Sequence, residues 1–135
     1  MFFMKTKIII ITLLLTLALL LISLNIFQSA TGPHDGTVKP AGNYNIEMKN
    51  SYDNFYAYLL DKKRNPISNT EIYCEVKFIF PDSTSTVIPL KPFEEDGFSI
   101  ESGSLKFYSC RIYFKVSGKL ISASFDNESL IVLKK

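Results

Sequence analysis

The stretch EIYCEVKFIF, residues 71–80, decides the fold class because apolar and polar side chains alternate along it. One parity holds only apolar residues, which are Ile72, Cys74, Val76, Phe78 and Phe80. The other parity holds the charged residues of the stretch, which are Glu71, Glu75 and Lys77. Because successive side chains of a strand point to opposite faces, this pattern predicts a half-buried β-strand whose cysteine faces a core.

The second cysteine of the chain lies in a run of the same kind, FYSCRIYFKV at residues 107–116. Cys110 has the same parity as Ile112 and Phe114, so it too is expected to face a core. An inward cysteine on each of two strands is typical of strands B and F of an immunoglobulin domain, which a disulfide joins. The sequence leaves two alternatives open: a Cys74–Cys110 disulfide in an oxidising compartment, or two buried free thiols.

Short apolar runs bounded by turn signals continue through residues 44–135. They include YNIEM, NFYAYLL, STVIPL, GFSI, LISASF and LIVL. The stretch DKKRNP predicts a turn after the second of these runs, and VSGK predicts a tight hairpin after the run that contains Cys110. About seven short strands, with turn signals at intervals of about ten residues, predict an all-β domain with an immunoglobulin-like β-sandwich fold.

An apolar segment at the N-terminus predicts one transmembrane helix ahead of this domain. Lys5 and Lys7 precede the twenty uncharged residues 8–27. A helix of that length, rising about 1.5 Å per residue, would span a hydrocarbon core of roughly 30 Å. The segment is longer than the apolar part of a usual cleavable signal, so we expect residues 1–27 to be a retained signal anchor, with a cleaved signal as the alternative.

The positively charged flank of this segment favours a cytoplasmic N-terminus. We therefore expect a single-pass protein of the cytoplasmic membrane whose C-terminal domain, residues 44–135, is periplasmic or extracellular. Residues 28–43 contain three glycines and two prolines and almost no large apolar side chain, so they are interpreted as a linker. The expected partners are the lipid bilayer, through residues 8–27, and a protein of the cell envelope.

Charge and the scarcity of reactive side chains argue against several classes of function. The chain has fifteen basic and thirteen acidic residues, and two of the basic ones precede the apolar segment. The exported part is therefore formally neutral and offers no basic face, which argues against nucleic acid as a partner. No pair of nucleophile and base is recognisable in the sequence, so we predict that the protein is not an enzyme.

Two candidate binding sites remain. His34, in the stretch PHDG, is the only histidine of the chain, and imidazole is a common ligand of copper and zinc. The adjacent Asp35 offers one more ligand, whereas zinc normally takes four. A set of tyrosines is expected either to form an outward aromatic surface for a partner or to be ordinary sheet surface: Tyr52, Tyr56, Tyr58 and Tyr113.

Four stretches together resemble the YtkA-like domain family of small bacterial envelope modules: PHDGTVKPAGNYNIEM, YLLDKKRNPISN, FPDSTSTVIPLKP and GKLISASFD. In that family a histidine–glycine stretch follows the membrane segment, and a G-x-Y-x-I-E strand, a D-x-x-x-x-P turn and a final GK…A-x-F hairpin come after it. The resemblance covers residues 33–126, with Asp35 where a glycine is typical. It implies an immunoglobulin-like fold and an accessory role linked to copper or other metals in the envelope.

Two hypotheses about function follow. The first is a non-catalytic, membrane-anchored binding or accessory module outside the cytoplasm, with metal handling at His34 as its most specific form. The second is a structural domain that docks on a larger membrane complex through a sheet face or edge and binds no small ligand. Turn and strand signatures specify a fold better than an activity, so the sequence does not decide between the two.

Overall fold

The computed structural model describes residues 7–18, 31–103 and 105–127. These residues belong to two compact units, Met1–Ala30 and Thr31–Lys135, each of which is described by itself.

In the first unit, residues 7–18 form a helix. Two threonine hydroxyls within this apolar run are satisfied locally, since Thr12 and Thr16 each donate to the carbonyl oxygen four residues earlier at 2.8 Å. No helix among the described residues is both long and apolar enough to cross a membrane. The predicted helix at the N-terminus is therefore observed in part, and the rest of the predicted span, residues 19–27, lies outside the described residues.

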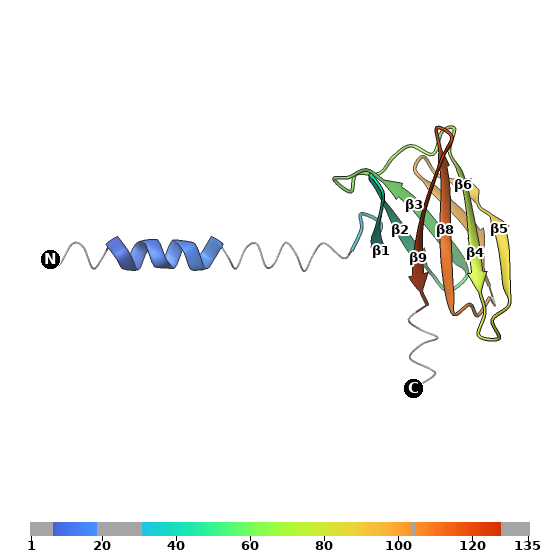
Figure 1. Ribbon diagram of the computed structural model, residues 1–135, viewed down its shortest axis with the longest axis horizontal. Helices are drawn as coiled ribbons and strands as arrows, with labels where there is room; N and C mark the ends of the chain where they lie inside the picture. The colour runs from blue at the N-terminus through green and yellow to red at the C-terminus, as the bar shows by residue number, and fades with distance from the viewer. Residues whose placement is uncertain (1–6, 19–30, 104, 128–135) are drawn as a thin grey trace. The chain divides into compact units, whose positions relative to one another are not determined.

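Within the described part of the second unit, nine strands form two antiparallel sheets (Figure 1). One sheet has the order β1-β2-β3-β7-β6, and the other has the order β5-β4-β8-β9. The all-β prediction is confirmed, with more strands than expected. The strands are β1 (Thr37–Ala41), β2 (Tyr44–Asn50), β3 (Asn54–Leu60), β4 (Tyr73–Ile79), β5 (Ser85–Pro89), β6 (Lys91–Phe93), β7 (Gly97–Glu101), β8 (Ser109–Val116) and β9 (Lys119–Asp126).

One hydrophobic core lies between the inner faces of the two sheets. The alternation predicted from residues 71–80 is observed in β4, where Cys74, Val76 and Phe78 are buried and their neighbours are partly exposed. Aromatic rings contact each other across the two layers: the ring centroids of Phe55 on β3 and Phe78 on β4 are 5.2 Å apart. Burying such a side chain contributes about 1.5–3 kcal/mol, so this core holds the two sheets together.

The Cys74–Cys110 disulfide, one of the two alternatives left by the sequence, is not formed: both thiols are free and buried. The two cysteines lie on β4 and β8, which are neighbours in one sheet, and Cys74 is opposite Phe114 while Cys110 is opposite Phe78. This register separates them by four positions, or about 14 Å along the strands. A disulfide requires Cα atoms roughly 4.4–6.8 Å apart. The comparison with strands B and F is therefore wrong, and the two buried thiols are confirmed.

The first strand of the structure lies inside residues 28–43, the segment interpreted as a linker. β1 pairs with β2 over its whole length, from Thr37 opposite Met48 to Ala41 opposite Tyr44. The glycines and prolines of this segment indicated a linker, whereas pairing with a neighbouring strand decides its structure. The final apolar run of the sequence, LIVL at residues 130–133, lies outside the described residues.

The hairpin predicted from VSGK is confirmed. β8 and β9 pair from Ser109 opposite Asp126 to Val116 opposite Lys119. The two residues between them, Ser117 and Gly118, have positive φ angles of 49° and 79°. Two-residue turns of this kind match the twist of an antiparallel pair, which explains why the short polar sequence closes the strands so tightly.

The outer face of the five-stranded sheet carries a second, smaller apolar cluster. Val38 on β1 and Tyr58 and Leu60 on β3 are buried there, and Tyr56 packs against them. These β3 residues alternate with the ones that face the main core, as expected for a strand covered on both sides. The cover over Tyr58 is a loop that precedes β1, and this loop forms the candidate site.

Candidate functional site

The segment from Thr31 to Thr37 forms a closed loop on the outer face of the five-stranded sheet. Thr31 and Thr37 make an isolated antiparallel bridge. Inside it, the N–H of Gly32 donates to the carbonyl oxygen of Gly36 at 2.9 Å, and the N–H of Asp35 donates to that of Gly32 at 3.0 Å. Asp35 has a φ of 63°, a conformation that aspartate adopts more readily than most residues. The backbone is thus fixed on both sides of His34.

The group that this loop encloses is the carboxylate of Glu47, on β2. The side chain of Glu47 is fully buried, with 0% of its surface exposed. The backbone N–H groups of His34 and Gly36 donate to its Oε2 at 2.9 and 2.8 Å, and Nδ1 of His34 lies 2.7 Å from its Oε1. Removing a carboxylate from water costs several kcal/mol unless hydrogen bonds and an opposite charge compensate for it. The loop supplies two backbone donors and Nδ1 of His34, which adds an opposite charge when the ring is protonated.

Two glycines allow the loop to approach this carboxylate. A side-chain carbon at Gly32 would overlap the carboxylate of Glu47, and one at Gly36 would lie 2.5 Å from the carbonyl oxygen of Met48. Glycine is the residue that permits such a close approach of backbone to another group. The glycines on either side of His34 are therefore needed for the enclosure of Glu47, and they do not mark a flexible linker.

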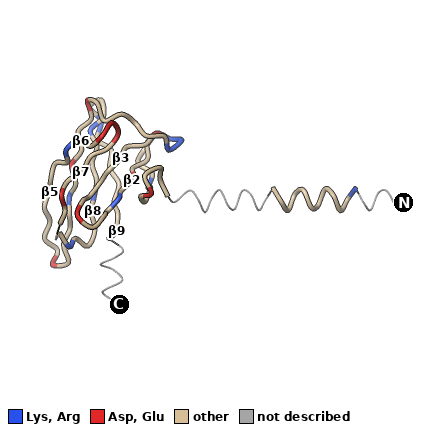
Figure 2. Tube along the Cα trace, turned by 180° about the vertical axis from the view of Figure 1, so that it is seen from behind, with Lys and Arg blue, Asp and Glu red and all other residues tan. Residues whose placement is uncertain are grey.

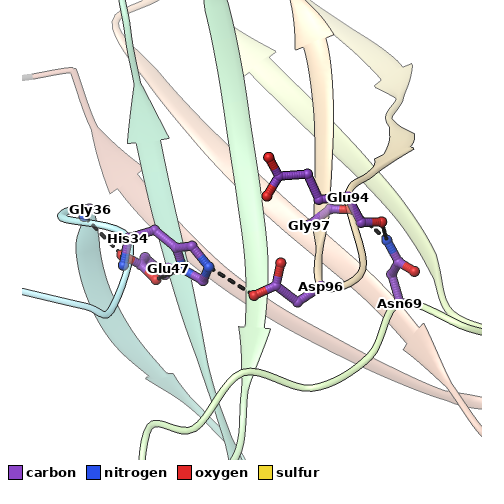
Figure 3. A network of polar contacts seen from close by, with 7 residues as sticks. All are labelled: His34, Gly36, Glu47, Asn69, Glu94, Asp96 and Gly97. Atoms are coloured by element: carbon purple, nitrogen blue, oxygen red, sulfur yellow. Dashed lines mark hydrogen bonds and ion pairs between the residues drawn. The ribbon is translucent and has the colours of Figure 1, made fainter.

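The imidazole of His34 is held between two carboxylates (Figure 3). Its Nδ1 faces Glu47, and its Nε2 lies 2.8 Å from Oδ2 of Asp96, which comes from the turn between β6 and β7. A neutral imidazole donates from one nitrogen only, whereas both nitrogens of the cation are donors. Between two ionised carboxylates, the imidazolium is the form that satisfies both contacts. The ring also stacks on Tyr58, with centroids 3.6 Å apart and planes 7° from parallel.

The turn that carries Asp96 is fixed by an asparagine from another part of the chain. The side-chain nitrogen of Asn69 donates to the carbonyl oxygens of Glu94 and Gly97 at 3.1 and 2.9 Å, and its backbone N–H donates to that of Glu95 at 2.9 Å. Figure 3 shows Asn69 on the far side of this turn from His34. Because Asn69 holds the turn by its backbone, the Asp96 carboxylate is positioned to reach the imidazole.

Burial and nearby carboxylates both change the pKa of the Tyr58 hydroxyl. Its pKa is raised to about 12, first by burial and then by the negative charges of Asp96, Glu47 and Glu94. Burial and nearby carboxylates both disfavour the tyrosinate anion. The hydroxyl of Tyr58 therefore keeps its proton to a higher pH than an exposed tyrosine does, and the neighbouring carboxylates contribute to this.

A depression of about 460 Å³ opens beside the stacked rings. Two of its walls are aromatic: the ring centroids of Tyr56 and Phe93 are 5.1 Å apart, and those of Tyr56 and Tyr58 are 6.5 Å apart. The remaining lining is polar or charged. The lining residues are His34, Asp35, Lys49, Ser51, Tyr56, Tyr58, Phe93 and Glu94.

His34, the predicted metal ligand, is thus part of an ordered site, but both of its ring nitrogens contact carboxylates. Within the described ranges, no group of three or more histidine, cysteine, aspartate or glutamate side chains is arranged to hold a metal ion. Copper or zinc binding at His34 stays a prediction. It requires the ring to release Asp96 or Glu47, because a ligand nitrogen must present its lone pair to the metal.

The four tyrosines expected to form one surface are divided between the sheets. Tyr56 and Tyr58 lie together on β3 of the five-stranded sheet, and Tyr52 is 94% exposed in the turn before it. Tyr113 lies on β8 of the four-stranded sheet, where the guanidinium carbon of Arg111 is 5.8 Å from its ring centroid. Acidic and basic residues are interspersed over both sheets and their turns (Figure 2).

Glu47 and Asp96 were not recognised from the sequence as site residues. Glu47 occupies the polar parity of its strand, a position typical of a side chain that faces water. Asp96 lies 62 residues after His34, in an acidic turn that has no local signal for a partner. The glycines at positions 32 and 36, on either side of the only histidine, are the one sequence feature that indicates a tight loop.

Comparisons with protein-family models, with curated proteins and with solved structures found no match to this chain. The resemblance to the YtkA-like domain family therefore stays a prediction, based on the four sequence stretches alone.

Proposed function

We propose that this chain is a non-catalytic binding module whose ligand site is the aromatic depression beside His34 and Tyr58. One observation carries the proposal. The loop that buries the carboxylate of Glu47 also holds the imidazole of His34 against the ring of Tyr58, which forms part of the wall of that depression. A rigid, pre-formed recess with aromatic walls and a few polar groups is the usual form of a ligand site. Both nitrogens of His34 are occupied by carboxylates, which leaves it unsuited to serve as the base of a nucleophile.

The strand order supports a finer assignment of the fold to the immunoglobulin-like class. β2, β3, β7 and β6 correspond in order to strands A, B, E and D, and β4, β8 and β9 correspond to strands C, F and G. β1 and β5 are additional edge strands. Under this assignment Cys74 lies on strand C and Cys110 on strand F, which are neighbours in one sheet, and the cysteine of strand B is missing.

The apolar segment 8–27, with Lys5 and Lys7 before it, supports attachment of this module to the cytoplasmic membrane with residues 31–135 outside the cytoplasm. The resemblance to YtkA-like domains supports an accessory role in the envelope beside a larger membrane protein. In its most specific form this role includes copper or zinc, which would bind at His34 after release of Asp96.

The second candidate function is a docking domain without a small ligand. It is favoured by apolar side chains on the outer face of the four-stranded sheet, where Tyr73, Val87 and Leu120 are 49%, 52% and 67% exposed. Scattered exposed apolar residues are common on sheet surfaces, so this observation supports docking less strongly than the built site supports ligand binding.

The two functions are separated by a ligand panel and a pair of variants. Binding is measured by isothermal titration calorimetry of the full chain in a maltoside detergent, because the chain has seven tyrosines and no tryptophan, and its fluorescence would not single out Tyr56 and Tyr58. The panel consists of Cu²⁺, Zn²⁺, choline and acetate. Binding of any member that is lost in Tyr56→Leu and kept in Leu120→Ser supports the module. Absence of binding by every member, or binding that Tyr56→Leu leaves unchanged, contradicts it.

A further inference from the structure

The aromatic depression differs from a metal site in the groups that it presents. Tyr56 and Phe93 are both half-buried and close together, with ring planes inclined by 53°. Tyr58 continues the wall next to Tyr56, and its ring is covered by the imidazole of His34. Rings of this kind offer π faces, which attract large, weakly hydrated organic cations. A metal ion requires lone pairs from several converging ligands.

Two carboxylates that line the depression have no ion-pair partner within the described part of the chain. Asp35 and Glu94 line the depression and are exposed. The two ion pairs observed among the described residues both belong to His34, so neither of these carboxylates has an opposite charge bound to it.

The balance of charge at the depression is negative. The one cation besides His34 among its lining residues is Lys49, on β2. Including the pair that holds His34, four carboxylates face at most two cations at this site: Asp35, Glu47, Glu94 and Asp96 against His34 and Lys49. Such a field repels anionic ligands and attracts cationic ones. After burial, three of these carboxylates also contribute to the raised pKa of Tyr58, which are Asp96, Glu47 and Glu94.

We propose that the depression binds the alkylammonium group of a small soluble amine, with the cation against the faces of Tyr56 and Phe93 and its charge balanced by Glu94 and Asp35. This inference rests on the proposed binding function and names the class of its ligand. The volume of about 460 Å³ accommodates a choline-sized group and leaves its other end in solvent. Lys49 opposes binding, and His34 fixes the wall against which the cation lies.

The test compares two ligands of equal shape and different charge. Choline and its neutral isostere 3,3-dimethylbutan-1-ol are titrated into the full chain in a maltoside detergent, with isothermal titration calorimetry as the readout and constant ionic strength. We expect about a tenfold preference for choline, because a desolvated cation–π contact and one nearby carboxylate are together of that size. Equal affinity for the two ligands would show that the depression is merely apolar and would overturn the proposal.

Four variants assign the preference to particular groups. Glu94→Gln should weaken choline binding about threefold, and Tyr56→Leu about tenfold, whereas Tyr56→Phe, which keeps the ring, should retain it. The matched control is Glu95→Gln, because Glu95 lies in the same turn and lines a neighbouring depression. An equal effect of Glu94→Gln and Glu95→Gln would contradict a direct role of Glu94. Circular dichroism shows which variants are folded, and Tyr56→Phe keeps the test decisive if Tyr56→Leu is not.

Two further ligands separate this inference from its alternatives. Phosphocholine should bind more weakly than choline, since Glu94 and Asp35 repel its phosphate; tighter binding of phosphocholine would overturn the assignment to a free amine. Binding of Cu²⁺ that Tyr56→Leu abolishes, without binding of choline, would overturn the inference and leave the proposed binding function intact. Failure of choline, Cu²⁺, Zn²⁺ and acetate alike would contradict both.

Discussion

Replacing His34 with alanine should destabilise the domain by an amount that can be worked out from its contacts. The substitution removes the contacts of Nδ1 with Glu47 at 2.7 Å and of Nε2 with Asp96 at 2.8 Å. It leaves the fully buried carboxylate of Glu47 with two backbone N–H donors and no opposite charge. Removing one member of a buried ion pair costs about 3–5 kcal/mol. That is a large fraction of the roughly 5–15 kcal/mol that stabilises a whole domain.

Two further variants distinguish loss of charge pairing from loss of packing. Asp96→Asn removes only the outer contact, and because the Asp96 side chain is 23% exposed, its cost should be about 1–2 kcal/mol. Glu47→Gln in the His34→Ala background removes the uncompensated charge, so the double variant should be more stable than His34→Ala alone by about 1–2 kcal/mol. In the native background the same Glu47→Gln change should be destabilising.

The assay is urea unfolding of the full chain in detergent, followed by far-UV circular dichroism, with unfolding midpoints compared at equal m-values. A cost of His34→Ala below about 1 kcal/mol would refute the buried pair as a source of stability. Equal effects of Glu47→Gln in the native and His34→Ala backgrounds would show that the two residues are not coupled. Either result would mean that packing, and not charge, holds the loop on the sheet.

Three other predictions follow from the structure. Gly36→Ala should cost about 1–3 kcal/mol of stability, because the added carbon would overlap the carbonyl oxygen of Met48. It should also abolish the hydrogen-exchange protection of the backbone amides of residues 34 and 36. Gly42→Ala, whose added carbon would meet nothing within 4 Å at a φ of 61°, should leave that protection in place. The pKa of Tyr58, raised to about 12, lies above that of a tyrosine in the unfolded chain. The contribution of Tyr58 to stability should therefore be complete below about pH 10 and be lost as the pH rises towards 12. Tyr58→Phe should lack this pH-dependent loss of stability, and an identical decline in both proteins would contradict the assignment. Burial raises the pKa of the Cys110 thiol to about 12 and also raises that of Cys74, so thiol reagents should label both cysteines only after unfolding. A reductant should leave the melting temperature unchanged. If the denatured, unreduced protein had no free thiols, the register of β4 and β8 would be contradicted.

The fold class was predictable because it depends on a local pattern. Alternation along β4 and β8 gives the inward positions of Cys74 and Cys110, and a two-residue polar turn gives the hairpin between Val116 and Lys119. The failures concern how strands are combined. Alternation places a cysteine on a face of a sheet, but it contains no information about which strand is its neighbour. The sequence therefore left the disulfide and the two free thiols open as alternatives, although it placed both side chains correctly in the core.

The site was less predictable because its members belong to three segments that come together only in the folded domain. His34 was identified as a candidate metal ligand. The composition of residues 28–43 nevertheless indicated a linker, because a segment rich in glycine and proline is usually flexible. In this loop the glycines at positions 32 and 36 have a different role: because they have no side chain, the backbone can lie close to the carboxylate of Glu47. The burial of Glu47 is likewise not visible in the alternation along β2, because parity distinguishes the two faces of a sheet and does not tell whether a loop covers the outer one. His34 contacts Glu47 through Nδ1 and Asp96 through Nε2, and its ring lines the aromatic recess together with Glu94 of the same turn as Asp96. His34 and Tyr58 belong both to the contacts that hold the loop and to the lining of the recess. Ligand binding and the stability of this face should therefore respond together to substitutions at His34.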